Sequence, residues 1–120
     1  MNQKSVLKEK SFQFSVYVVK VCRLLQESKA RSVIWNQFQR SGTAISALIH
    51  EAEYAQSKAD FVNKLSVALK EANETDYWLK LMKESGTIDE VNFSAANELL
   101  TEIIKMLVSS IRTAKSNLSK

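Results

Sequence analysis

Residues 58–85 carry the most regular hydrophobic pattern in the chain. From Phe61 onward, apolar or small residues recur at alternating spacings of four and three, the heptad pattern of a helix with one packed side. The members of this pattern are Phe61, Leu65, Ala68, Ala72, Thr75, Leu79 and Met82. Ser57 followed by Asp60 is similar to a capping box, and Ser85-Gly86 is typical of a helix end. The pattern therefore predicts a helix over about 58–85.

Three further stretches show one apolar side each. Residues 93–117 are amphipathic, with charged side chains opposite the apolar ones. Upstream, apolar stripes predict helices over about 5–28 and 31–55. The three stripes consist, in chain order, of Phe14, Val18, Val21 and Leu25; of Ile34, Phe38, Ile45, Leu48, Ile49 and Ala52; and of Phe93, Ala96, Leu100, Ile103, Ile104, Leu107, Ile111 and Ala114.

The links between these predicted helices are only a few residues long. Short links between long helices force consecutive helices to run antiparallel. The chain has no Pro and only two Gly, which leaves little material for hairpin turns. Its length of 120 residues suits one hydrophobic core. We therefore expect an all-α fold with a single domain over residues 1–120, an antiparallel up-down-up-down four-helix bundle.

Small residues gather around Gly42 within the predicted helix 31–55. The group comprises Ser41, Gly42, Thr43, Ala44, Ser46 and Ala47. Gly costs about 1 kcal/mol relative to Ala inside a helix, so some interaction must compensate for it. The pattern favours the close approach of a neighbouring helix backbone. A kink at Gly42 is the alternative.

Two predicted helices have more apolar surface than a single bundle can bury. The first carries a second stripe, Phe12, Val16 and Val19, nearly opposite its core stripe, and the helix over 58–85 carries Val67, Tyr77 and Leu81 away from its heptad positions. Exposed contiguous apolar surface usually marks a partner site. We expect a homo-oligomer formed through these residues. Scattered surface hydrophobes, which are common, are the alternative.

The charge of the chain is unevenly distributed. The formal net charge is +4, and the first forty residues contain Glu9 and Glu27 as their only acidic side chains. The basic residues of that segment are Lys4, Lys8, Lys10, Lys20, Arg23, Lys29, Arg31 and Arg40. A basic segment attracts nucleic acid, and an oligomer multiplies the number of phosphates it can contact. We expect these side chains to bind phosphates, with an ordinary solvated Lys-rich surface as the alternative.

The sequence contains no catalytic signature. His50 and Glu51 share a helix, but the chain has no second His, so di-iron and zinc-protease patterns are excluded. Glu71 and Glu74 fall at positions that normally face solvent or form ion pairs, and Cys22 has apolar neighbours. We expect a protein that is not an enzyme and has no cofactor, no metal and no membrane span. One Cys and no signal peptide favour the cytoplasm.

Three segments of the chain resemble the four-helix-bundle family of 23S rRNA intervening sequence proteins. They are "KSFQFSVYVVKV", "RSGTAISALIHEA" and "QSKADFVNKLSVALKEANETDYWLKLMKESG", and the similarity covers nearly the whole chain. The resemblance implies a homopentameric ring of antiparallel bundles with a basic surface suited to nucleic acid, and no catalytic residues. Relatives include the accessory protein of diversity-generating retroelements. The chain departs from many relatives at Ala44 and Leu48, where they have Ser and Asn.

These observations lead to one leading hypothesis for function. According to this hypothesis, the protein is a non-enzymatic homo-oligomer, pentameric by resemblance, that contacts RNA or DNA phosphates through a basic surface. The alternative is a protein-interaction scaffold or accessory subunit of a nucleic-acid enzyme such as a reverse transcriptase.

Overall fold

The computed structural model describes residues 3–27 and 33–118 of the chain. It contains four helices: α1 (Gln3–Glu27), α2 (Val33–Ala52), α3 (Lys58–Glu84) and α4 (Glu90–Leu118). The all-α class and the four-helix architecture predicted from the sequence are confirmed. Two of the predicted phosphate contacts, Lys29 and Arg31, lie outside the described residues.

Helix α3 has the end signals that its sequence predicted. The Ser57 side chain accepts a hydrogen bond from the backbone N–H of Asp60 at 3.0 Å, which satisfies one of the free donors of the first turn. At the other end, Ser85 donates its backbone N–H to the carbonyl of Leu81, and Gly86 follows with a positive φ of 72°. Gly adopts this left-handed conformation without the steric cost that a side chain would impose.

Two helix ends lie three residues from the predicted ones, and the other ends lie within two residues. The predicted helix 31–55 ends as α2 at Ala52, because residues 53–55 donate their N–H groups to carbonyls three residues back and so form a tighter turn. Helix α4 begins at Glu90, three residues before the predicted start. The Asp89 carboxylate accepts the N–H of Asn92 at 2.8 Å and caps the earlier turn.

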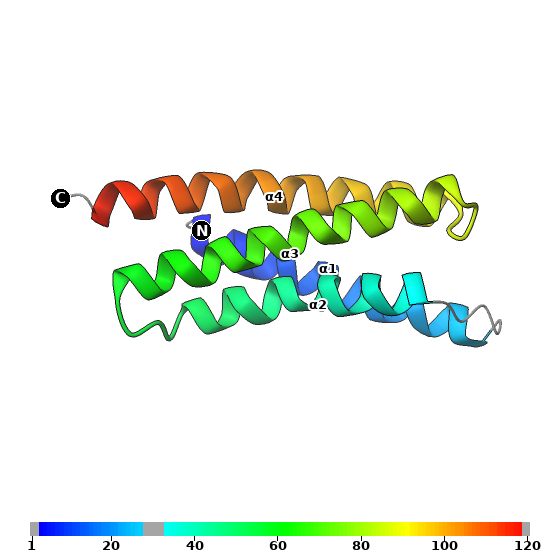
Figure 1. The fold of residues 1–120 in the computed structure, drawn as a ribbon, viewed down its shortest axis with the longest axis horizontal. Coiled ribbons are helices and arrows are strands. Elements are labelled where there is room, and N and C mark those ends of the chain that lie inside the picture. The colour runs from blue at the N-terminus through cyan, green and yellow to red at the C-terminus, as the bar shows by residue number, and fades with distance from the viewer. Residues whose placement is uncertain (1–2, 28–32, 119–120) are drawn as a thin grey trace.

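The four helices run alternately in opposite directions along the long axis of the molecule (Figure 1). Consecutive helices pack on one another, and α1 packs on α4 to close the ring of four. The backbones of the diagonal pairs, α1 with α3 and α2 with α4, do not approach each other closely over the described residues, although their side chains share the core. The start of α1, the end of α4 and the α2–α3 connection therefore lie toward one end of a bundle measuring 52 × 23 × 22 Å.

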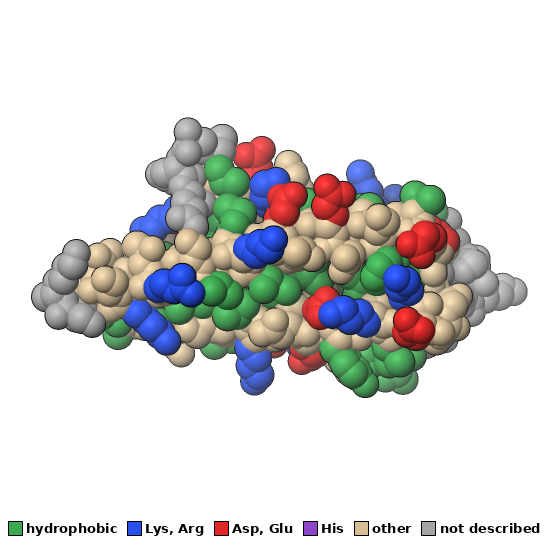
Figure 2. Space-filling view, turned by 90° about the horizontal axis from the view of Figure 1, so that it is seen from above, with side chains coloured by type: hydrophobic (Ala, Val, Ile, Leu, Met, Phe, Trp, Pro, Cys, Tyr) green, Lys and Arg blue, Asp and Glu red, His purple; other side chains and the backbone are tan. Residues whose placement is uncertain are grey.

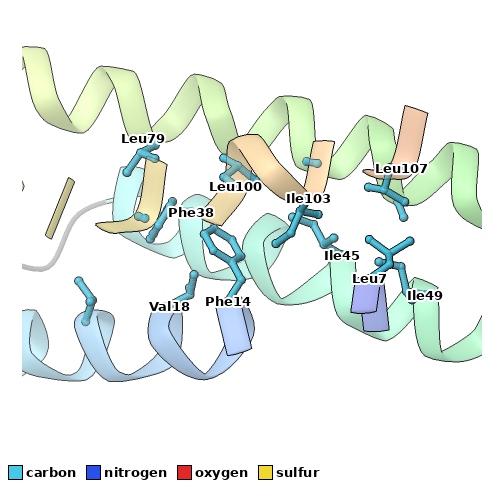
Figure 3. Packing of buried hydrophobic residues seen from close by; sticks show 14 of the residues in the cluster. Leu7, Phe14, Val18, Phe38, Ile45, Ile49, Leu79, Leu100, Ile103 and Leu107 are labelled. Atoms are coloured by element: carbon cyan, nitrogen blue, oxygen red, sulfur yellow. The ribbon is translucent and has the colours of Figure 1, made fainter. Parts of the chain in front are cut away.

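One continuous core fills the interior of the bundle. Figure 3 shows side chains from all four helices pointing toward one another, among them Phe14, Val18, Phe38, Ile45, Leu79, Leu100 and Ile103. The heptad residues predicted for α3 are buried except for Phe61, which is partly buried while its neighbour Val62 is buried. Burying each large apolar side chain contributes about 1.5–3 kcal/mol relative to leaving it in water. The core therefore accounts for the amphipathic pattern of the sequence.

Helix α1 packs closely against α2 at Gly42. A Cβ atom added to Gly42 would lie 3.2 Å from Cγ2 of Val18 and 3.5 Å from Cε2 of Phe14. The close approach predicted from the small residues is therefore present. The prediction was wrong about the neighbouring atoms, since they belong to two large side chains of α1 and not to its backbone. Because Gly42 has no side chain, the side chains of Val18 and Phe14 fit against α2 at this position.

Small hydroxyl side chains of α2 form hydrogen bonds with both neighbouring helices. The Ser46 hydroxyl bonds to that of Ser15 on α1. On the α3 side, Thr75 donates to the Ser41 hydroxyl at 2.9 Å. These hydrogen bonds satisfy polar groups that would otherwise lose water without compensation.

Candidate assembly and nucleic-acid surfaces

The outer side of α1 is apolar along its middle. Phe12, Val16 and Val19 are 64%, 38% and 46% exposed. They follow one another at i, i+4 and i+7, so they form one row along the helix. The second stripe predicted for this helix is thus open to water in the single chain. An exposed apolar row of this kind is typical of an interaction surface.

The outer side of α3 carries a second, more aromatic surface. Tyr77 is 58% exposed and packs edge-on against Trp78, with ring centroids 5.0 Å apart. Val67 is also exposed, whereas Leu81 is half-buried. The two surfaces therefore belong to helices that lie diagonally across the ring from each other.

Several of the predicted phosphate contacts are already bound to carboxylates. Lys8 lies 3.0 Å from a carboxylate oxygen of Glu53, and Lys10 lies 2.6 Å from one of Glu102. The hydrogen bond and the negative charge of Glu102 raise the pKa of Lys10. Each of these ammonium groups has a neighbouring negative charge that offsets its attraction for a phosphate.

Arg40 is paired in the same way. Its guanidinium contacts the carboxylates of both Glu71 and Glu74 on α3, the first at 3.2 Å. Glu74 also accepts a hydrogen bond from the indole N–H of Trp78 at 3.1 Å. The two Glu residues are therefore partners of Arg40 and Trp78, which is a structural role that the sequence left open.

Lys20 and Arg23 differ from the basic residues that are paired with carboxylates. Both are exposed on α1, next to the apolar row that ends at Val19. Neither makes an ion pair with a residue that the structure describes. Among the predicted contacts on the described part of the chain, Lys20 and Arg23 share this lack of a described ion pair with Lys4, whose ammonium lies over the Phe61 ring.

The sequence interpretation missed a further group of basic residues near the end of α4. Lys105, Arg112 and Lys115 are exposed there, and residues 103–118 include no Asp or Glu. Figure 2 looks onto the α4 side of the bundle, and its left end shows Lys and Arg side chains without acidic ones among them. The predicted phosphate contacts all lie within the first forty residues, so this segment was left out of the prediction. The absence of acidic residues over sixteen positions was the available signal.

A pocket of about 580 Å³ lies at the same end of the bundle, between the start of α1 and the α2–α3 connection. Its apolar lining includes Leu7, Ile49 and Leu65. The Lys4 ammonium at its edge lies 4.6 Å from the centre of the Phe61 ring. The sequence did not predict this pocket, because it is formed by segments far apart in the chain.

The residues considered for catalysis or metal binding have contacts of a structural kind. The His50 ring contacts the Tyr54 ring edge-on at 5.6 Å, and Glu51 lies 3.8 Å from the Lys64 ammonium. Cys22 is buried, and burial raises the pKa of its thiol to about 11. Over residues 3–27 and 33–118, no three His, Cys, Asp or Glu residues come together in a way that could hold a metal ion.

None of the helices in the described ranges has an apolar stretch long enough to cross a bilayer.

The fold and its surfaces define an antiparallel four-helix bundle with open apolar and basic faces. The family model described as 23S rRNA-intervening sequence protein matches residues 3–109, and the chain belongs to this family. Comparison with curated proteins gave no match.

A solved structure supports the same assignment. It comes from Bacteroides thetaiotaomicron and is described as a protein of unknown function from the S23 ribosomal protein family. That protein is 45% identical to this chain, with a TM-score of 0.89. The similarity covers 92% of this chain and 99% of the other.

Proposed function

We propose that the protein is a non-enzymatic homo-oligomer, a pentameric ring by family resemblance, that binds RNA or DNA through phosphate contacts. The observation that carries this proposal is the outer side of α1. There an exposed apolar row, Phe12 to Val19, adjoins Lys20 and Arg23, whose charges have no described partner. Assembly through the row would place copies of these two cations at regular intervals around the oligomer.

The relative position of the two apolar surfaces supports a ring. A twofold dimer uses the same patch on both copies, whereas this chain exposes two different patches, on α1 and α3, which are not neighbouring helices. A contact between α1 of one copy and α3 of the next is head-to-tail. Such contacts generate a closed ring when the rotation between copies completes a circle.

The distribution of free cations supports backbone contacts over base reading. Lys20 and Arg23 are joined by the exposed Lys105 and Arg112 on α4 as candidates for phosphate binding. Phosphate contacts release counterions, so affinity for nucleic acid falls steeply with salt. The family description refers to 23S rRNA, which makes a structured ribosomal RNA fragment the first probe to use.

Filter binding of that RNA at several salt concentrations tests the proposal. We expect the double variant Lys20→Ala/Arg23→Ala to lower the slope of log affinity against log salt by about one for each phosphate that the variant no longer binds. The matched control is Lys8→Ala/Lys10→Ala, which removes the same charge from side chains already paired with Glu53 and Glu102. Its slope should change less. Affinity that is absent at low salt, or does not depend on salt, rules out the proposal.

In the alternative function, as an accessory subunit, the same surfaces of the chain would bind a different protein. The aromatic pair Tyr77 and Trp78 on α3 favours it, since aromatic side chains are enriched at protein interfaces. Light scattering of the purified chain separates the two functions. A mass of several subunits, reduced by Phe12→Asp, supports self-assembly. A single subunit at micromolar concentration favours the alternative and contradicts the ring.

A further inference from the structure

We propose that the pocket at the start of α1 holds one unpaired nucleobase, while Lys4 and Lys58 contact the phosphates on either side of it. This inference rests on the proposed nucleic-acid binding and names the form of nucleic acid that is preferred. It predicts that the protein favours single strands and loops over continuous duplex.

The walls of the pocket are suited to a flat, apolar ring. Leu7, Ile49 and Leu65 line it from three different helices, and Figure 3 shows Leu7 and Ile49 side by side at this end of the core. Phe61 and Tyr54 add two aromatic rings, and Tyr54 is largely exposed. Bases stack on such rings with little dependence on sequence, because every base has an aromatic face.

The cations around the pocket are suited to phosphates. Lys58 is exposed in the first turn of α3, where the helix dipole also favours negative charge, and it makes no ion pair with a described residue. The Lys4 ammonium lies 4.6 Å from the centre of the Phe61 ring. A base that stacks on this ring displaces the ammonium, which then has a neighbouring phosphate to bind.

The carboxylate in the pocket lining does not oppose this charge arrangement. Glu53 is paired with Lys8 at 3.0 Å, so its negative charge is compensated before any ligand arrives. Lys4 and Lys58 remain as the uncompensated charges at the rim. Two separate cations suit successive phosphates of a strand better than the single head group of a fatty acid.

The size and position of the pocket favour unpaired nucleotides. Its volume of about 580 Å³ lies within the usual range for small-molecule sites, so it can admit one nucleoside. In a continuous duplex the faces of each base are covered by its neighbours. Protein recognition of RNA bases accordingly occurs mostly at loops, bulges and single strands, where a base can turn outward.

A single-stranded RNA containing 2-aminopurine tests the inference, with the same strand in duplex form as the comparison. We expect a change in 2-aminopurine emission when the protein binds the single strand at low salt, and none with the duplex. Ala55→Phe fills the pocket without changing its charge, and should weaken single-strand binding by about tenfold, the effect of removing one stacked base. Duplex affinity should stay within about twofold, since phosphate contacts dominate it.

Two controls separate the pocket from folding and from general binding. Tyr54→Ala removes a largely exposed ring and should also weaken single-strand binding, which gives a second readout if Ala55→Phe lowers the melting temperature. Lys20→Ala, outside the pocket lining, should weaken binding to single strand and duplex alike.

The possible failures are distinguishable. Salt-dependent binding of both RNAs without an emission change, or with both pocket variants behaving as wild type, overturns the pocket assignment and leaves the proposed function standing. Absence of binding to either RNA at low salt overturns the proposed function and the pocket assignment together.

Discussion

The inner and outer sides of α1 are built from the same kinds of residue and end in opposite environments. Phe14 is fully buried and Phe12, two positions earlier, is 64% exposed; Val18 is fully buried and Val19 is 46% exposed. The exposure of these side chains differs because each residue of a helix is rotated by about 100° from the preceding one. Close neighbours in the sequence therefore face different directions. Helices α2 and α4 of the same chain pack against the inner side, which is part of the common core. The outer side has no cover within the described structure, and its apolar area is available to another molecule.

The largest expected difference between the two sides is in core stability. Phe14→Ala should lower the free energy of unfolding by about 3–5 kcal/mol, because it leaves a cavity between α1 and α2 and also reduces the buried apolar area. Urea denaturation followed by circular dichroism measures this. A loss below about 1 kcal/mol would show that Phe14 is not part of a packed interior.

The buried thiol of Cys22 gives the next test of the inner side. Burial raises its pKa from 9.0 to about 11, so at pH 8 the native protein should react with iodoacetamide at least about a hundredfold more slowly than the urea-unfolded chain. The folded state keeps this proton between pH 9 and 11 while the unfolded state has released it, so stability should fall as the pH rises through that window. Equal rates in native and unfolded protein would place the thiol at the surface.

Gly42 tests how tightly the inner side of α1 is packed. Gly42→Val should destabilise the protein by about 1–3 kcal/mol, because even a Cβ there lies 3.2 Å from Val18. Adding Val18→Ala to this variant should recover part of the loss. Thermal melts of the single and double variants measure this coupling, and a stabilising Gly42→Val would mean that α1 lies farther from α2.

Ser15 tests a polar contact on the inner side. Ser15→Ala should cost about 0.5–1.5 kcal/mol, since the partly buried hydroxyl of Ser46 loses its hydrogen-bond partner. The double variant Ser15→Ala/Ser46→Ala should be less destabilised than the sum of the single variants, because no orphaned hydroxyl remains. Strict additivity in a double-mutant cycle of urea melts contradicts the contact.

The smallest effect on the fold itself is expected on the outer side. Phe12→Ser should change the unfolding free energy by less than about 0.5 kcal/mol at protein concentrations low enough to dissociate an oligomer. At higher concentration the loss should grow, because assembly stabilises the wild-type subunit by mass action. A loss as large as that of Phe14→Ala at every concentration would mean that Phe12 packs within its own subunit.

Most of the fold followed from local patterns in the sequence. The heptad spacing from Phe61 to Met82 predicted the buried side of α3, and Ser57 and Gly86 predicted its ends. Boundaries were less predictable where competing hydrogen bonds decided them, as with the Asp89 cap that starts α4 early and the tight turn after Ala52. Trp35 was also missed as a core residue, since it lies one position after Ile34 in the predicted stripe.

The candidate surfaces were predictable only in part. The exposed row on α1 could be read from helical periodicity, because a second stripe opposite the core stripe cannot face the same interior. Whether each cation is paired with a carboxylate could not be predicted from the sequence. Whether Lys8 or Lys20 has a carboxylate beside it depends on which residue of another helix lies opposite, and Glu53 is forty-five positions away from Lys8.

The amino-acid sequence by itself determined four amphipathic helices, their antiparallel order, and an apolar surplus on α1, because these depend on local spacing and short connections. Tertiary structure alone decided which charges are neutralised, that the α1 and α3 surfaces lie on helices diagonally across the ring, and that a pocket opens beside Lys4. The physical reason is that ion pairs, cavities and the ring order of helices arise between segments distant in the chain. Their distances are set by how the whole core packs.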